Sequence, residues 1–310
     1  MTLSNGEFMS EKLPDLSHLT LAAREVAMLP DDQRISYVRG DRWIGYTRAG
    51  DALQRLEELF VWPSKQRMPN LLLIGPTNNG KSMIVEKFRR QHNGEARGTR
   101  DYEAIPVVVV QMPSEPSVSR FYGMLLASLG APMRRQTRLV ELEQVALQLL
   151  RTVKVRVLII DELHNILSAK ENVRRQFLNL IRFLGNELRI PIVGVGTREA
   201  YMAIRSDPQL ENRFEPMPLP VWEEGEELLK LLSSFCSMMP LRSQSSIATE
   251  EMSKYLLART DRTIGEIAKL LTAATLVAIE TGEEAINQKT LAQADYKSPN
   301  ERRQTFECVL

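Results

Sequence analysis

The sequence predicts an α/β protein with a parallel sheet, followed by a domain built from helices alone. Short apolar segments alternate with segments of helical periodicity as far as about residue 221, a pattern typical of parallel strands joined by right-handed helical crossovers. After residue 222 only helical patterns remain. A glycine-rich loop of the phosphate-binding type, residues 75–82, follows the first apolar segment. These three observations define the expected fold class.

The segments that we expect to form strands are short, apolar and rich in β-branched residues. They are residues 70–74, 105–110, 157–160, 190–196 and, more weakly, 217–220. Helical spacing predicts helices at 19–28, 49–60, 83–88, 121–129, 139–150 and 177–184, with a further helix start at Pro30. Later helices are expected at 226–238, 249–258, 264–281 and 290–294. The expected organisation is an N-terminal arm (1–42), an α/β core (43–221), a helical lid (222–296) and a C-terminal tail (297–310).

The composition is that of an ordinary globular chain. Of 310 residues, 43% are hydrophobic and 25% are charged, and the formal net charge is +1. Overall charge therefore gives no sign of a nucleic-acid or membrane partner, and any such contact depends on local patches. The two cysteines and three histidines fit neither a disulfide framework nor a zinc site. We expect a cytoplasmic protein, because no apolar run is long enough to span a membrane and the first residues lack the pattern of a signal peptide.

The glycine-rich loop has the full pattern of a P-loop. Its residues are Gly75, Pro76, Thr77, Asn78, Asn79, Gly80, Lys81 and Ser82. The glycines allow backbone N–H groups to surround phosphates, Lys81 adds a positive charge there, and Ser82 is a ligand for Mg²⁺. The helix that follows, which contains Met83, directs its positive N-terminal end at the same anion. We therefore expect this loop, together with Met83, to bind the phosphates of a nucleotide.

The second half of a nucleotide site is expected at the end of the strand 157–160. This apolar run leads directly into Asp161 and Glu162, and the carboxyl ends of parallel strands are where such folds bind ligands. Asp161 is expected to hold the Mg²⁺ complex, and Glu162 to polarise the attacking water. Two carboxylates after an apolar run are common at ordinary strand ends. Downstream of a P-loop, however, they indicate an ATPase site with ATP and Mg²⁺ as cofactors.

Two further residues have the order expected of an AAA+ ATPase. Thr197 follows the strand 190–196, where a hydroxyl group senses the terminal phosphate or caps the next helix, and the two roles are compatible. Arg213 lies near the end of the segment 207–214 and is expected to act as an arginine finger on the nucleotide of a neighbouring subunit. The alternative for Arg213 is a surface arginine paired with Glu211 or Glu215.

Two more positions bear on the nucleotide itself. Ile44 and Tyr46 precede the P-loop strand by one helix and are expected to sandwich the adenine base, the alternative being core packing of the arm. A sensor-2 arginine is expected at the start of the helix 264–281, but the aligned position is Ile264 or Gly265, and Arg262 is the nearest candidate. We therefore expect slow hydrolysis.

The chain resembles the TniB family, the AAA+ helpers of Tn5053/Tn402-type transposons, which are related to TnsC of Tn7-like elements. The resemblance covers nearly the whole chain and is strongest in residues 41–46, 70–89, 110–117, 161–165, 194–198 and 209–216. It implies a homo-oligomer, as a ring or a helical filament, that assembles with ATP on double-stranded target DNA with little sequence specificity. It also implies that the assembly recruits a DDE transposase similar to TniA, with a TniQ-like protein as a further partner. Hydrolysis is then expected to drive disassembly.

Two segments are candidates for the DNA contact. In ATPases similar to TnsC the stretch after the second strand faces DNA, and this resemblance makes Ser117, Ser119 and Arg120 candidate ligands of the phosphate backbone. Arg134 and Arg135 lie in the densest basic stretch of the chain. For either segment the alternative is a solvated turn. Repetition of a small patch along an oligomer multiplies a weak contact, so a nearly neutral monomer is compatible with tight binding.

Two other functions share these motifs. One is a replication-initiator or helicase-loader ATPase, whose nucleotide site has nearly the same sequence pattern. The other is a signalling NTPase, in which the nucleotide switches a protein-interaction surface without DNA. The nucleotide-binding residues do not separate these functions from a transposition regulator, and it is the family resemblance that favours the last.

Overall fold

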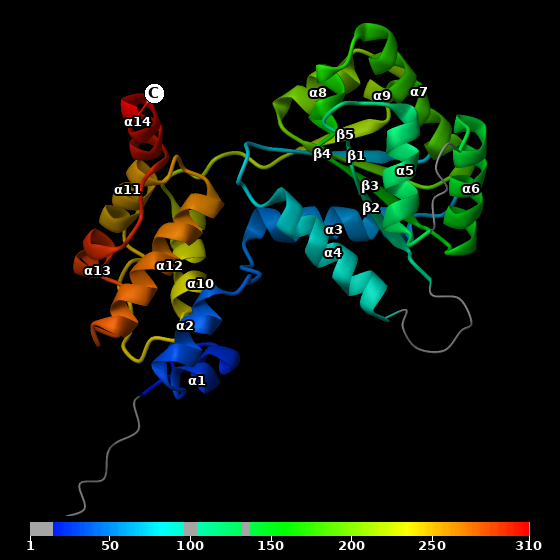
Figure 1. The fold of residues 1–310 in the computed structure, drawn as a ribbon. Helices are drawn as coiled ribbons and strands as arrows, with labels where there is room; N and C mark the ends of the chain where they lie inside the picture. Colours follow the sequence, from blue (N-terminus) through cyan, green and yellow to red (C-terminus); the bar gives the residue numbers. More distant parts are fainter. Residues whose placement is uncertain (1–14, 96–103, 132–136, 310) are drawn as a thin grey trace, which may run out of the picture. The chain divides into compact units, whose positions relative to one another are not determined.

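The computed structural model describes residues 15–95, 104–131 and 137–309. The chain forms two compact units (Figure 1). The core unit consists of residues 45–222 together with 263–265, and the helical unit contains the described parts of 1–44, 223–262 and 266–310. None of the helices in the described ranges combines the length and the apolar character needed to cross a membrane.

A five-stranded parallel sheet forms the centre of the core unit, in the order β2-β3-β4-β1-β5. The strands are β1 (Asn70–Ile74), β2 (Val107–Gln111), β3 (Val157–Asp161), β4 (Ile192–Gly196) and β5 (Phe214–Pro218). The expected parallel sheet is thereby confirmed. Only β5 departs clearly from expectation, because it begins at Phe214 rather than at residue 217. It pairs with β1 alone, and an edge strand accommodates Pro216 and Pro218 because one of its sides needs no N–H donors.

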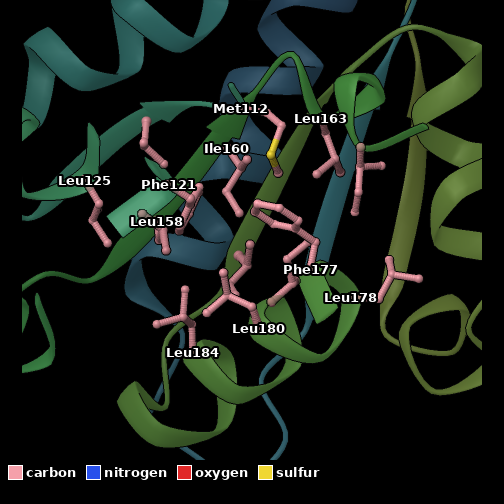
Figure 2. Packing of buried hydrophobic residues seen from close by; sticks show 14 of the residues in the cluster. Met112, Phe121, Leu125, Leu158, Ile160, Leu163, Phe177, Leu178, Leu180 and Leu184 are labelled. Carbon is pink, nitrogen blue, oxygen red and sulfur yellow. The ribbon is translucent and has the colours of Figure 1, made fainter. Parts of the chain in front are cut away.

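Helices cover both faces of this sheet. They are α3 (Thr47–Val61), α4 (Lys81–Glu95), α5 (Val118–Ser128), α6 (Leu139–Thr152), the 3₁₀ helix η1 (Leu163–Ser168), α7 (Glu171–Leu188), α8 (Arg198–Arg205) and α9 (Pro208–Glu211). On one face, Leu158 and Ile160 of β3 share a buried cluster with Phe121 of α5 and Phe177 of α7 (Figure 2). Helix α4 packs against β2, β4 and α3. Burial on both faces explains why the strands read as continuous apolar runs.

The helical unit joins the two ends of the chain. Its helices are α1 (Leu21–Ala27), α2 (Asp31–Arg39), α10 (Glu226–Met238), α11 (Glu250–Arg259), α12 (Ile264–Glu280), α13 (Gln288–Gln293) and α14 (Pro299–Val309). The first two residues of α12 belong to the core unit, and the helical unit contains α12 from Glu266 onward. The segment expected as a tail thus contains a helix. Its start is stabilised by a reciprocal cap, in which the Ser298 N–H donates to Glu301 at 2.6 Å and the Glu301 N–H donates to Ser298 Oγ at 3.2 Å.

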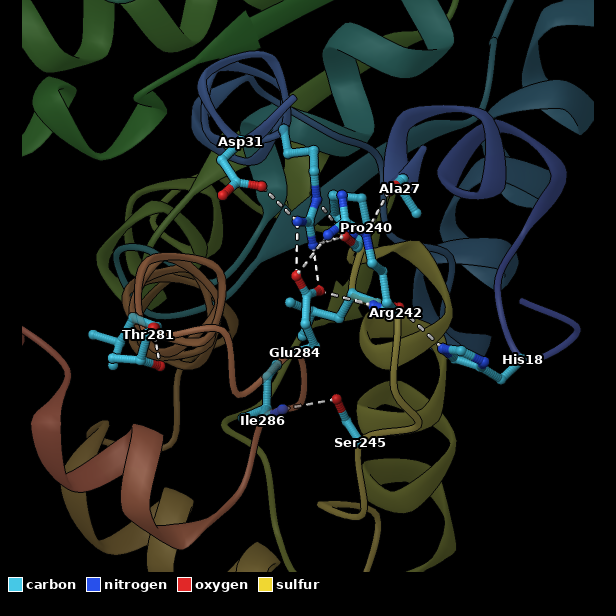
Figure 3. Close-up of polar contacts among 12 residues, drawn as sticks. His18, Ala27, Asp31, Pro240, Arg242, Ser245, Thr281, Glu284 and Ile286 are labelled. Atoms are coloured by element: carbon cyan, nitrogen blue, oxygen red, sulfur yellow. Dashed lines mark hydrogen bonds and ion pairs between the residues drawn. The ribbon is translucent and has the colours of Figure 1, made fainter. Parts of the chain in front are cut away.

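A cluster of charges around the buried Arg34 fastens α2 to the later helices of this unit (Figure 3). The side chain of Arg34 is fully buried and donates to both carboxylate oxygens of Glu284. It also donates to the Pro240 carbonyl from Nε at 3.1 Å and from Nη2 at 2.8 Å. The Arg242 backbone N–H donates to Glu284 at 3.0 Å, and Arg242 Nε donates to the Ala27 carbonyl at 3.1 Å. The N-terminal helices are therefore an integral part of the helical unit.

Candidate functional site

The P-loop connects β1 to α4, as its sequence predicts. Gly80 has φ 85°, a left-handed conformation that glycine adopts without steric cost. Lys81 is buried, and its ammonium group donates to the carbonyls of Gly75 and Pro76, both at 2.7 Å. Burial lowers the pKa of Lys81, while the nearby charges of Glu162 and Asp161 act in the opposite direction. A cationic group thus lies inside the loop, beside the N-terminal N–H groups of α4, which the helix itself leaves without acceptors.

Gly75 allows the P-loop to pass unusually close to the segment after β5. A Cβ atom at Gly75 would lie 2.5 Å from the Leu219 carbonyl oxygen and 3.1 Å from Leu219 Cβ. The first of these distances is impossible without a backbone shift. The Leu219 N–H in turn donates to the Ile74 carbonyl at 2.6 Å. The glycine at the start of the loop is therefore required by packing against Leu219.

Asn79 holds the P-loop in place from inside the core unit. Its buried side-chain amide donates to the carbonyls of Leu219 and Pro220, each at 2.9 Å. Its Oδ1 accepts a hydrogen bond from the Ile264 N–H at 3.3 Å. We expected Asn79 as a nucleotide-binding residue, and its side chain is occupied by these three protein partners. Any contact that Asn79 makes with a nucleotide would therefore come from its backbone.

Oxygen ligands suitable for a divalent cation converge at the carboxyl ends of β1 and β3. The Ser82 hydroxyl, on the first turn of α4, donates to Asp161 Oδ2 at 3.2 Å. The other oxygen of Asp161 accepts the Glu162 backbone N–H at 2.8 Å. A hydroxyl and a carboxylate in contact are the hard oxygen donors that Mg²⁺ takes from proteins when it keeps phosphate and water as its other ligands. This donor set fits the expected metal.

Thr197 lies across the site, at the end of β4. It occupies the N-cap position of α8, but its hydroxyl makes no capping bond and donates to the carboxylate of Glu199 instead. A cavity of 480 Å³ opens beside it, of a size typical for small-molecule sites. The lining residues of this cavity are Ile74, Gly75, Pro76, Thr77, Thr197, Arg198, Glu199, Pro218, Leu219 and Pro220. The structure thus brings the P-loop and the expected sensor to one cavity.

Tyr46 packs near the P-loop, within the core unit. A Cβ atom at Gly80 would lie 3.1 Å from the Tyr46 hydroxyl. The Tyr46 ring also meets the buried ring of Trp222 edge-on, with centroids 5.2 Å apart, and Arg48 lies 5.7 Å from the Trp222 ring. Burial raises the pKa of Tyr46 to about 12. Ile44 belongs to the helical unit, so the expected Ile44–Tyr46 sandwich remains a prediction.

The position expected for sensor 2 lies against the P-loop without a charged side chain. The Gly265 N–H donates to the Asn78 carbonyl at 3.0 Å, and a Cβ atom at Gly265 would overlap the Asn78 side chain. Arg262 is exposed and has φ 57°. At Gly265, the position where a sensor-2 arginine was expected, a backbone N–H therefore contacts the P-loop instead of a guanidinium.

Arg213 lies at the amino ends of the parallel strands, whereas the P-loop lies at their carboxyl ends. Its carbonyl accepts the Asn70 N–H, at the amino end of β1, and its guanidinium donates to Asn186 at 2.8 Å. Burial lowers the pKa of Arg213, and the charges of Arg67 and Arg182 lower it further. The alternative of a pairing with Glu211 or Glu215 is wrong in this structure. Those carboxylates pair with Arg205 and Arg55, respectively.

Arg213 also borders a cavity of 440 Å³ whose other lining residues are Lys65, Arg67, Met68, Pro69, Gln209 and Asn212. Three side chains of this lining, those of Lys65, Arg67 and Arg213, are cationic, and none of the lining side chains is a carboxylate. Such a cavity favours an anion.

The residues proposed for DNA contact fall into two groups. Ser117, Ser119 and Arg120 are exposed at the start of α5, directly after the carboxyl end of β2, and Arg120 lies 3.8 Å from Glu115. Arg134 and Arg135 lie outside the described residues. The first group has the N–H groups of a helix N-terminus beside it, which adds to its suitability for phosphate oxygens.

Several residues of the site had no local signal in the sequence. Trp222 contacts Tyr46 across 176 positions of chain, and the Asn79 side chain bonds to Leu219 and Pro220 across 140 and 141. A buried asparagine inside a P-loop looks like any other loop residue until its long-range partners are known. Only the glycine at 265 gave a hint, because it stands where an arginine was expected.

The fold is similar to solved structures of AAA+ ATPases. The ORC1 protein of Aeropyrum pernix in complex with DNA matches with a TM-score of 0.58 at 14% identity, covering 84% of this chain and 68% of that one. The Pyrobaculum aerophilum Cdc6p structure gives 0.56 at 15%, covering 86% and 71%. The Aeropyrum pernix ORC2 protein in ADPNP–ADP complexes gives 0.55 at 14%, covering 83% and 70%. At these identities the likeness shows the fold alone, an α/β core with a parallel sheet.

The family assignment comes from the sequence. No curated protein matches the chain. The family model described as bacterial TniB protein matches residues 34–224, which include the P-loop, Asp161, Glu162, Thr197 and Arg213. The match covers more than half of the chain, and this chain belongs to the TniB family.

Proposed function

We propose that this protein is an ATP-dependent regulator of DNA transposition. It assembles on double-stranded target DNA with ATP, recruits a DDE transposase, and dissociates after hydrolysis. The observation that carries the proposal is that two groups of residues suited to a nucleotide lie at opposite ends of the parallel strands. At the carboxyl ends of the strands lie Lys81, Ser82, Asp161 and Glu162. Arg213 lies at their amino ends.

At the carboxyl edge, the chain has groups for each part of a nucleotide–metal complex. Lys81 and the first N–H groups of α4 would hold the phosphates, and Ser82 and Asp161 would hold Mg²⁺. The metal, when bound, neutralises charge that develops on the transferred phosphoryl group. Glu162 then serves as the base that orients the attacking water, and Thr197 as the donor to the terminal phosphate. The segment 218–220 forms a wall of the adjoining cavity and would shield the nucleotide from water on that side.

At the amino edge, Arg213 cannot serve its own P-loop, because the length of β1 separates the two. A five-residue strand spans about 16 Å. The anion that fits beside Arg213 is therefore supplied from outside the subunit, and the terminal phosphate of a neighbouring subunit's nucleotide meets this need. A planar, permanently cationic guanidinium is the group suited to spread phosphoryl charge. The site is complete only between two copies, so ATP favours the oligomer.

The DNA contact is assigned to the start of α5. Ser117, Ser119 and Arg120 are exposed there, and hydroxyl, guanidinium and helix N-terminal N–H groups bind phosphate oxygens without reading bases. Membership of the TniB family supports a transposase similar to TniA and a TniQ-like protein as partners. Chemistry on DNA would then belong to the transposase.

The first test combines electron microscopy with gel shift on double-stranded DNA, in the presence of ATP, ADP or a non-hydrolysable ATP analogue. We expect ordered assemblies with the triphosphates alone. Lys81→Ala and Arg213→Ala should abolish them, whereas Arg175→Ala, an exposed arginine paired with Glu171 on α7, should not. Glu162→Gln should trap ATP-bound assemblies. If triphosphate changes neither DNA binding nor assembly, the proposal fails.

A mixing experiment tests whether Arg213 acts between subunits. Lys81→Ala subunits carry Arg213 but lack a working P-loop, and Arg213→Ala subunits have the reverse defect. Each alone should be inactive as an ATPase. A mixture should regain activity, because some interfaces pair an intact P-loop with an intact Arg213. No recovery on mixing, with both variants folded, would argue against the shared site.

The initiator or helicase-loader alternative shares the fold, and the likeness to ORC and Cdc6 structures does not exclude it. Its distinguishing result is the transfer of a ring helicase to DNA with no effect on a transposase. A signalling NTPase would instead form oligomers without affinity for DNA.

A further inference from the structure

The helical unit contains a cavity of 340 Å³ at the point where two of its helices begin. Glu226 and Glu250, the first residues of α10 and α11, both border it. The full lining consists of Glu224, Gly225, Glu226, Leu229, Glu250 and Ser253. Three of these side chains are carboxylates and none is cationic. The volume lies at the lower end of the range for small-molecule sites, roughly 300–1,000 Å³, which suits a single side chain or a small molecule.

The carboxylates of this cavity are only weakly neutralised by the protein itself. Lys254 Nζ lies 3.9 Å from Glu224 Oε2, and Lys230 Nζ lies 3.8 Å from Glu226 Oε2. Both distances are longer than a hydrogen bond, and the two lysine side chains are 62% and 66% exposed, so neither pair contributes much. Glu250 forms no ion pair with any other residue in the described ranges. The cavity therefore keeps a negative charge that a bound cation would neutralise.

Ser253 adds a second, independent indication of a ligand. The residue is 1% exposed, and its hydroxyl oxygen has no hydrogen-bond partner in the part of the chain that the structure describes. Two other buried hydroxyl groups of this unit bond to the carbonyl four residues earlier, Thr260 to Leu256 at 2.7 Å and Thr275 to Leu271 at 2.8 Å. A buried hydroxyl without a partner costs about 1–3 kcal/mol. Because Ser253 lines the cavity, a ligand bound there would supply the missing partner.

The ligand is more extended than a metal ion. Within the described residues, no three His, Cys, Asp or Glu side chains are placed to hold a metal, so the three carboxylates of the cavity do not converge on one point. A planar guanidinium has five N–H donors and can reach carboxylates and a hydroxyl that lie apart. Residues 223–230 and 250–254 contain six glutamates and two lysines, a balance that repels nucleic acid. The chemistry thus favours an organic cation.

Gly225 indicates that the ligand also carries hydrogen-bond acceptors. It is the N-cap residue of α10 and provides no side-chain cap, so the first N–H groups of this helix lack a side-chain acceptor. A Cβ atom at Gly225 would have nothing within 4 Å, so the space beside it is open. The main-chain carbonyls of a bound polypeptide would satisfy these N–H groups, whereas a free polyamine has no carbonyl to offer.

We propose that this cavity binds an arginine side chain on an exposed basic segment of a partner protein. The guanidinium donates to the carboxylates of Glu226 and Glu250 and to the hydroxyl of Ser253, and the main chain of the partner accepts from the start of α10. The inference goes beyond the proposed function and does not depend on it. None of the lining residues belongs to the nucleotide site, and the test needs no nucleotide.

The test is a titration of the full-length protein with the peptide Gly-Ser-Arg-Ser-Gly, blocked at both ends and followed by ligand-observed NMR. The same peptide with citrulline in place of arginine is the reference, because citrulline has nearly the same shape and no charge. We expect the arginine peptide to bind with a Kd below about 1 mM and the citrulline peptide to bind about 10-fold more weakly. Equal binding of the two peptides, or no binding of the arginine peptide at about 1 mM, would overturn the proposal.

Three variants separate the cavity from a generally acidic surface. Glu250→Gln should weaken binding of the arginine peptide about 10-fold, and Ser253→Ala roughly 2–12-fold, through the loss of a charged and of an ordinary hydrogen bond, respectively. Glu251→Gln removes the same charge from the next residue, outside the lining, and as the matched control should change the Kd by less than about twofold. Ser253→Ala also removes an unpaired buried hydroxyl, so its melting temperature should equal or exceed the wild-type value, which a merely structural role for Ser253 would not allow.

Other results would assign the cavity differently and overturn the proposal. Equal losses in Glu250→Gln and Glu251→Gln would show attraction to a diffuse acidic surface. Displacement of the peptide by spermidine at concentrations below the Kd of the peptide, with the same dependence on Ser253, would identify a free polyamine as the ligand. A lower sedimentation coefficient of the free protein in Glu250→Gln would identify a second copy of this chain as the occupant. Failure of the wild-type protein to assemble on DNA with ATP would refute the proposed function alone.

Discussion

Replacement of Asn79 by alanine should destabilise the core unit by about 2–4 kcal/mol. The buried side chain makes three hydrogen bonds, to the carbonyls of Leu219 and Pro220 and from the Ile264 N–H, at 2.9, 2.9 and 3.3 Å. Each such bond contributes roughly 0.5–1.5 kcal/mol, so the three together contribute about 1.5–4.5 kcal/mol, a span that contains the expected loss. The lower end of the expected range applies if the segment 219–220 relaxes toward solvent.

The assay is urea unfolding of the full-length protein followed by tryptophan fluorescence, to which the buried Trp222 of the core unit contributes. Asn79→Asp keeps the acceptor for Ile264 but loses both donors, so it should lose at least as much stability as Asn79→Ala. Gln176→Ala, on the exposed side of α7, is the control and should change the unfolding free energy by no more than about 0.5 kcal/mol. If Asn79→Ala proves as stable as this control, the three hydrogen bonds do not hold the P-loop.

Three other substitutions test separate parts of the structure. Gly75→Ala should abolish nucleotide binding in a fluorescent-nucleotide titration, because its Cβ would lie 2.5 Å from a backbone oxygen, whereas Gly50→Ala, with nothing within 4 Å, should raise the melting temperature. Arg34→Met should lower the unfolding free energy by about 3 kcal/mol, measured by circular dichroism, because it removes a fully buried guanidinium and leaves the partly buried carboxylate of Glu284 with one partner fewer. Glu86 has a pKa lowered to about 2, chiefly by hydrogen bonds from Arg89. Because this pKa is depressed in the folded state, its contribution is present above about pH 4.5 and is lost as the pH falls toward 2, so Glu86→Gln should flatten the acid limb of a stability–pH curve.

The parts of the site that local sequence patterns encode were predictable. A P-loop, an apolar run ending in carboxylates and a parallel sheet together require that Lys81, Ser82 and Asp161 meet, because the carboxyl ends of parallel strands share one edge. The contact of Ser82 with Asp161 at 3.2 Å confirms this geometry. The role expected of Arg213, on the nucleotide of a neighbouring subunit, stays a prediction, and the structure places this residue at the amino end of β1.

What could not be predicted depends on contacts between distant segments. The three partners of Asn79, the packing of Trp222 on Tyr46 and the approach of Leu219 to Gly75 each join residues more than 100 positions apart. No periodicity records such pairs. The same holds for the N-terminal helices, which the sequence presented as a separate arm and the structure groups with α10–α14. The edge strand β5 was placed late because its prolines resemble a boundary rather than a strand.

The contact between Arg34 and Glu284 also sets the order in which the protein can be completed during its synthesis. The two residues are 250 positions apart. At typical elongation rates of 5–20 residues per second, the ribosome needs roughly 10–50 s to make the intervening chain. All five strands of the core emerge within that interval, because residues 45–222 are continuous. Helices α1 and α2 are therefore synthesised well before the helices of the same unit against which they pack. A chain that stops before Glu284 leaves the guanidinium of Arg34 without its carboxylate partner.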